Sequence, residues 1–253
     1  AGFFDVVTWE GSNDANRQIA HNLGSVPGFI SIKRYSGNED WTCYHKSLGA
    51  NGWIQLNGSD SSYNGSWFMN DTEPTSTHFS VGSHGRVNST GWKYVAYLFA
   101  DNPSNEIKCG TYTGTGPGMS VDVGFRPHWV LIKSTSHGST RWVIGDSSRP
   151  GEVLWPDTAD AAYPHSVSFT DTGFTLDSNS SYMNSSGYTY IYIAIGSPTG
   201  MSSVPTGTLV ADADPSTNTA SIAATSWPTG DTVTGPSLGA SLTSVLEVSG
   251  NTI

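Results

Sequence analysis

Apolar and polar side chains alternate along Gly28-Phe29-Ile30-Ser31-Ile32-Lys33-Arg34-Tyr35, with the period of two that is typical of a half-buried β-strand. The pattern and its preceding Gly-x-x-Pro corner return at an offset of 100 residues, in Gly124-Phe125-Arg126-Pro127-His128-Trp129-Val130-Leu131-Ile132-Lys133. Further along, Asn88-Ser89-Thr90-Gly91-Trp92-Lys93-Tyr94 matches Asn184-Ser185-Ser186-Gly187-Tyr188-Thr189-Tyr190. The sequence therefore predicts one structural unit that occurs twice.

The composition favours strands over helices. Of the 253 residues, 36% are hydrophobic and only 13% are charged, while Gly, Ser, Thr and Asn are abundant. Such a chain is poor in strong helix formers and rich in turn and strand residues. No segment has helical periodicity over three turns, so we expect an all-β protein.

The expected architecture is an antiparallel β-sandwich of jelly-roll or lectin-like type, built from two homologous halves. Residues 1–103 form the first repeat, residues 104–200 the second, and residues 201–253 a Ser/Thr/Gly-rich linker with a small β module or extended arm. Two arrangements stay open: one sandwich in which each half lends strands to both sheets, or two sandwiches side by side. Size favours the first, because a half alone would have a thin core.

Charge and hydropathy exclude several classes of function. The net charge of −10 arises from few charges, and no basic stripe is present, so we expect no nucleic-acid partner. No apolar run is long enough to span a membrane, and we expect no membrane insertion. Asp212 with Asp214, and Asp157 with Asp160, do not reproduce a calcium loop, so we expect neither a metal nor a cofactor. Because the sequence starts at Ala1, we expect a piece of a longer protein.

The strongest acid-base candidates are His21 and His45, the latter close to Glu39 and Asp40. Neither histidine has a counterpart at the matching position of the second half. We therefore favour histidines that are hydrogen-bonded at strand ends. Because no nucleophile elbow, His-Glu-x-x-His or Cys-x-x-Cys motif occurs either, we do not expect an enzyme.

Residues that recur in both halves are expected to belong to the scaffold. Core packing is the default for four aromatic residues on repeated strands: Trp41, Trp129, Trp142 and Tyr94. Lys33 and Lys133 occupy matching positions and are expected to be solvated strand ends. Cys43 lies in an apolar strand pattern and is predicted to be a buried free thiol, with a Cys43–Cys109 bridge as the alternative.

Two polar, aromatic excursions interrupt the repeated strands, at residues 47–74 and 147–165. Their candidate ligand-binding rings are Trp53, Tyr63, Trp155 and Tyr163. Exposed aromatic faces beside amides and hydroxyls suit sugar rings and protein interfaces. The alternative is that these rings cap the ends of the sandwich.

The spaced motifs resemble a known domain. The strings Ile19-Ala20-His21-Asn22-Leu23-Gly24-Ser25-Val26-Pro27, Tyr44-His45-Lys46-Ser47-Leu48 and Thr189-Tyr190-Ile191-Tyr192-Ile193-Ala194 resemble a domain found in large virion proteins of marine and cyanobacterial phages. The resemblance covers Ala1 to about Pro198. It implies a place in tail fibres or other surface appendages, with no assigned reaction.

The resemblance makes a non-enzymatic virion structural protein the leading expectation, acting in assembly and host-surface attachment. Its partners would be copies of itself in a homo-oligomer, with a trimer as one option, other virion proteins, and host surface glycans. We expect it on the surface of the virion. The alternative is a stand-alone, lectin-like carbohydrate-binding module of a secreted bacterial protein, and a polysaccharide-degrading enzyme is a third hypothesis.

Overall fold

The structure, a computed structural model, divides into two compact units, Ala1–Ser197 and Pro198–Ile253. It describes residues 2–165 and 167–196 of the first unit. In the second unit it describes only two antiparallel pairs of short strands, β17 (Val210–Ala211) with β18 (Ala220–Ser221) and β19 (Glu247–Val248) with β20 (Asn251–Thr252). The rest of the expected arm at residues 201–253 lies outside the described residues.

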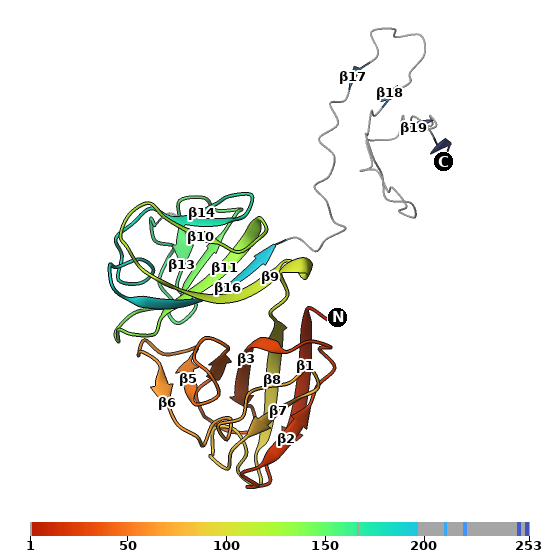
Figure 1. The fold of residues 1–253 in the computed structure, drawn as a ribbon, viewed down its shortest axis with the longest axis vertical. Coiled ribbons are helices and arrows are strands. Elements are labelled where there is room, and N and C mark those ends of the chain that lie inside the picture. The colour runs from red at the N-terminus through yellow and green to blue at the C-terminus, as the bar shows by residue number, and fades with distance from the viewer. Residues whose placement is uncertain are drawn as a thin grey trace. The chain divides into compact units, whose positions relative to one another are not determined.

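The first half of the chain builds two sheets of its own (Figure 1). The larger has the strand order β1-β8-β3-β4-β5-β6 and the smaller pairs β2 with β7, antiparallel throughout. The strands are β1 (Phe4–Glu10), β2 (Arg17–Ala20), β3 (Pro27–Arg34), β4 (Thr42–His45), β5 (Gly52–Gln55), β6 (Tyr63–Asn64), β7 (His78–Val81) and β8 (Lys93–Ala100).

The second half follows a single 3-10 turn, η1 (Pro103–Asn105), and again builds a large and a small antiparallel sheet. Their strand orders are β13-β12-β11-β16-β9 and β10-β15-β14. The strands are β9 (Ile107–Thr113), β10 (Met119–Asp122), β11 (Pro127–Ser134), β12 (Val143–Asp146), β13 (Val153–Leu154), β14 (Val167–Phe169), β15 (Gly173–Leu176) and β16 (Thr189–Gly196).

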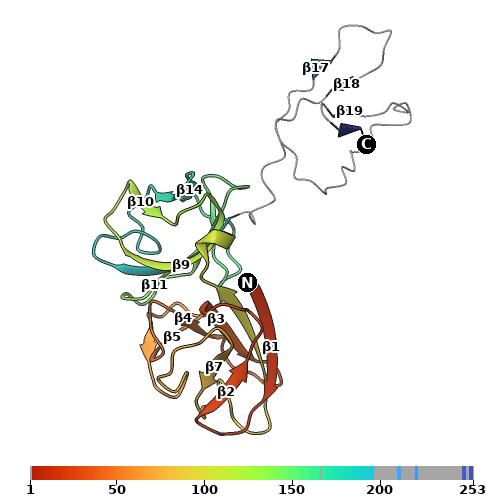
Figure 2. The ribbon, with the colours of Figure 1, turned by 45° about the vertical axis from the view of Figure 1, so that its right-hand side comes forward.

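These sheets confirm the expected all-β, antiparallel fold and correct the favoured arrangement. Each sheet takes its strands from one half, so the halves do not lend strands to each other. Figures 1 and 2 show the red-to-olive strands of the first half and the green-to-cyan strands of the second as two groups joined between β8 and β9. None of the helices in the described part of the chain is long and apolar enough to cross a membrane.

Each large sheet packs through both of its faces, and the expectation of a half-buried β3 is wrong, because Pro27 to Ile32 are buried on both faces. One face packs on the small sheet of the same half, as Trp9 does edge-on against Phe79, with ring centroids 5.8 Å apart. The other face contributes to a core that both halves share, since Leu131, Trp142 and Ile193 belong to the same buried cluster as the first-half residues. A shared core explains why residues 1–197 form one compact unit.

Five strands follow the same order in the two large sheets, with β1, β8, β3, β4 and β5 in the places of β9, β16, β11, β12 and β13, and β6 is an additional strand of the first. Repeated residues make matching bonds. The Tyr94 hydroxyl accepts from Ser89 N at 3.0 Å and donates to Gly85 O at 2.9 Å. The Tyr190 hydroxyl likewise accepts from the N–H group of Ser185. The origin of this similarity in a duplication stays an inference from the sequence.

Candidate functional site

The aromatic pair of the first excursion lies on neighbouring strands. Trp53 on β5 is directly opposite Tyr63 on β6, and their rings stack with centroids 4.4 Å apart. Trp67 meets Trp53 edge-on at 5.0 Å. These neighbours leave Trp53 only 8% exposed, while Tyr63 is half-buried.

The second excursion places its pair in a similar way. Trp155 follows β13 and is 6% exposed, and its ring lies 5.7 Å from that of Tyr163. Tyr163 forms a bridge with Val153 and is 47% exposed. The expectation of exposed platforms is therefore wrong for Trp53 and Trp155, which are enclosed by other rings. It holds for Tyr163, and ligand binding by the four residues stays a prediction.

The two pairs differ in the residue that covers the Trp from a third side. The Arg86 guanidinium lies 5.3 Å from the centroid of the Trp53 ring, and Tyr182 meets Trp155 edge-on at 4.8 Å. Arg86 and Tyr182 precede Asn88 and Asn184 by two residues each, so they occupy matching positions of the repeated motif. The first half therefore has a cation where the second has a neutral ring.

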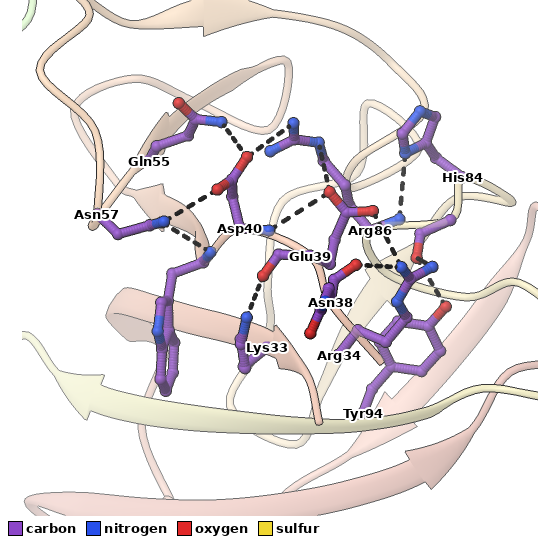
Figure 3. A network of polar contacts seen from close by, with 12 residues as sticks. Lys33, Arg34, Asn38, Glu39, Asp40, Gln55, Asn57, His84, Arg86 and Tyr94 are labelled. Atoms are coloured by element: carbon purple, nitrogen blue, oxygen red, sulfur yellow. Dashed lines mark hydrogen bonds and ion pairs between the residues drawn. The ribbon is translucent and has the colours of Figure 1, made fainter. Parts of the chain in front are cut away.

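Arg86, which lies over the Trp53 ring, also anchors the polar network drawn in Figure 3. Arg86 forms ion pairs with Glu39 at 3.5 Å and with Asp40 at 3.2 Å. The side-chain amides of Gln55 and Asn57 donate to the two oxygens of Asp40, each at 2.9 Å. Both adjacent carboxylates thus have cationic or amide partners, and the network fastens three loops to each other.

Arg34 extends the network beyond Glu39 (Figure 3). It pairs with Glu39 at 3.5 Å and donates to the carbonyl of Asn38, and its guanidinium lies 4.3 Å from the centroid of the Trp92 ring. Lys33 donates to the carbonyl of Glu39. Sequence reasoning missed Arg34 and Arg86. The available signal was that two of the few cations stand at positions where the second half has Ser134 and Tyr182.

The two candidate histidines bind the backbone, as favoured from the sequence. His45 is fully buried; its Nδ1 accepts from Ser47 N at 3.1 Å, so Nε2 carries the proton and donates to Tyr192 O at 3.0 Å. Burial lowers the pKa of His45 to about 4. His21 has the same arrangement, with Nδ1 accepting from Leu23 N, and burial lowers its pKa as well. Both ring nitrogens of each histidine are therefore engaged in structural bonds.

Lys133 overturns the expectation of a solvated strand end. It is fully buried, and its Nζ donates to Ser59 O at 3.1 Å and to Thr140 O at 2.5 Å. Burial lowers its pKa to about 8, against the smaller, opposite effects of Asp157 and Asp60. Because Ser59 belongs to the first half and Lys133 to the second, this amine joins the two halves.

The remaining predictions have mixed outcomes. Cys43 is a buried free thiol, as predicted, and Cys109 is also free and buried, so the alternative of a bridge between them is wrong. Burial raises the pKa of Cys43 to about 12. Trp142 and Tyr94 are core residues, whereas Trp41 and Trp129 are only partly buried. Within residues 2–165 and 167–196, no group of three His, Cys, Asp or Glu side chains is placed to hold a metal ion.

Comparison with known proteins places the chain in a family without assigning a reaction. No curated protein and no solved structure matches it. A family model described as a domain of unknown function, DUF7483, matches residues 1–198, which are the first compact unit and one more residue. The chain therefore belongs to the DUF7483 family.

Proposed function

We propose that this chain is a non-enzymatic structural protein of a phage virion, part of a tail fibre or comparable surface appendage, which acts in assembly and host attachment. The resemblance of its spaced motifs to virion proteins supports the setting. The observation that carries the structural role is an uncovered, aromatic sheet face on β1 and β8, where Phe4 and Val6 are each 45% exposed. Surfaces of this kind mark sites of protein association.

The surroundings of His45, Glu39 and Asp40, the acid-base candidates of the sequence, are consistent with this role. A general base must reach the proton that it removes and needs a pKa near the working pH. His45 is buried, and its pKa is lowered to about 4. Glu39 and Asp40, the acids nearest to it in sequence, are paired with Arg34 and Arg86. His45, Glu39 and Asp40 thus make structural contacts, as we expect in a protein that acts by assembly.

The experiment that tests the proposal is localisation on the particle. A gold-labelled antibody against this chain should decorate one defined appendage in electron micrographs of purified virions. The same antibody, saturated beforehand with the purified chain, is the control for specificity. A chain that stays in the lysate and is missing from purified particles would rule out the structural role.

A second candidate is carbohydrate binding, favoured by the exposed Tyr163 ring beside Trp155 and His165, with centroid distances of 5.7 and 4.6 Å. A glycan array should then show binding that Tyr163→Ala abolishes. Tyr35→Ala is the matched control, since Tyr35 is 54% exposed and lies outside both excursions. Binding that is equally strong in both variants, or no binding by the wild type, would count against this function.

A further inference from the structure

One face of the large sheet of the first half is covered at β4 and uncovered at β1. Phe4, Phe99, Phe29 and His45 are directly opposite one another across four strands, so their side chains point to the same face. Their exposure falls from 45% at Phe4 to 3% at Phe29 and 0% at His45, and Phe99 is half-buried. This face of the sheet is therefore buried at β3 and β4 and becomes accessible to solvent from β8 to β1.

The neighbouring row of side chains has the same gradient. Val6 is opposite Tyr97, Tyr97 is opposite Ser31, and Ser31 is opposite Cys43. Val6 is 45% exposed, Ser31 4% and Cys43 0%. The rings on the uncovered side contact each other, since the ring centroid of Phe4 lies 5.0 Å from that of Phe99 and 6.2 Å from that of Tyr97. We call Phe4, Val6, Tyr97 and Phe99 the open face.

The second half covers the other part of this face. His45 on β4 donates to Tyr192 O at 3.0 Å, and a Cβ atom on Gly28 of β3 would lie only 2.7 Å from Cys109 Sγ. The open face is therefore the continuation, within the same sheet, of the interface between the two halves. Continuity of this kind indicates a surface that is suited to close packing.

On the matching strands of the second half, the side chains at the same positions are buried. Ile107 and Cys109 on β9 occupy the places of Phe4 and Val6 in the shared strand order, and they are 0% and 1% exposed. Ile193 occupies the place of Tyr97 and is 3% exposed. The same position in the architecture is thus buried in one half and open in the other.

We propose that a second copy of this chain covers the open face, through a two-fold interface that brings Phe4 and Val6 of one copy against the same residues of the other. In a two-fold contact the same patch lies on both sides, and side chains near the axis meet their own copies, so a patch with charges of one sign would repel itself. The chain has a net charge of −10, yet the open face consists of uncharged side chains. This inference deepens the proposed structural role, because it names the first partner in the assembly.

The test compares two lysine substitutions in the full chain by analytical ultracentrifugation over a range of concentrations. The wild type should sediment as a dimer in the micromolar range, and Val6→Lys should weaken the dimer by about tenfold or more, because a charge would be buried in the contact. The matched control is Val26→Lys. Val26 is 50% exposed and lies in the turn before β3, outside the open face, so this variant should dimerise like the wild type.

Circular dichroism and thermal unfolding would show whether the variants fold. If Val6→Lys does not fold, Phe4→Gln repeats the test with a smaller change at the other exposed position. A monomeric wild type would overturn the proposal, even if the open face then binds another virion protein. Equal dimerisation of Val6→Lys and Val26→Lys would also overturn it. Either result leaves the labelling of virions as a separate test of the structural role.

Discussion

Lys133 shows how one residue can link the two halves and make their stability depend on pH. Burial lowers its pKa from 10.5 to about 8, so between these values the unfolded chain binds more protons than the folded one. Stability therefore rises with pH across this window. Between pH 8 and pH 10.5, the free energy of unfolding of the wild type should rise by on the order of 3 kcal/mol more than that of Lys133→Met. Urea unfolding at a series of pH values measures this difference. Parallel pH profiles of the two proteins would contradict this assignment.

His45 makes the free energy of unfolding depend on pH at the acidic end of the profile. Its pKa is lowered from 6.5 to about 4, so stability is lost as the pH falls through this range and the buried imidazole must take up a proton. The loss attributable to His45 is on the order of 3 kcal/mol. In His45→Gln, whose amide can still donate to Tyr192 O, acid unfolding should shift to lower pH. His78→Gln is the control, because His78 is more exposed and its Nδ1 forms a hydrogen bond with the hydroxyl of the neighbouring Thr77. A shift of equal size in both variants would argue against a special role for His45.

At the scale of an element, the aromatic stack on β5 and β6 contributes to the stability of the fold. Trp53 is 8% exposed, so Trp53→Ala should cost about 3–5 kcal/mol in the free energy of unfolding. Tyr163→Ala should cost less than about 1 kcal/mol, because its ring is 47% exposed. Chemical denaturation of both variants checks the difference. If Trp53→Ala were as stable as the wild type, the stacked arrangement with Tyr63 would be refuted.

The positions of strands were easier to predict from the sequence than the burial and contacts of individual side chains. The alternation along β3 is a local pattern, and the structure has this strand at Pro27–Arg34, within one residue of the expected Gly28–Tyr35 at each end. The exposure of Trp53 and Lys133 depends on partners far along the chain. Arg86 and Ser59 cover them from loops whose paths leave no local signal in the sequence. The same limit hid the network around Glu39, because ion pairs between loops are set by tertiary packing.

At the scale of the whole unit, residues 1–197 should unfold as one body although their sheets divide by halves. The shared core includes Leu131 and Trp142 of the second half, and Trp142 Nε1 donates to Gln55 O of the first at 2.7 Å. A change deep in one half should then weaken the other. The sharpest probe is Leu176→Ala, because Leu176 is fully buried in the cluster that belongs to the second half alone.

Hydrogen exchange measured by mass spectrometry can follow β8, in the first half, for this variant. If the unit is cooperative, Leu176→Ala should lower the protection of the slowest β8 amides by its own cost, about 2–5 kcal/mol. Leu131→Ala, in the shared core, calibrates the response of β8 to a change at the interface itself. Should Leu176→Ala speed exchange only in β9 to β16 and leave β8 unchanged, the halves would be independent domains. In that case the interface through His45, Lys133 and Trp142 would hold them together without coupling their stability.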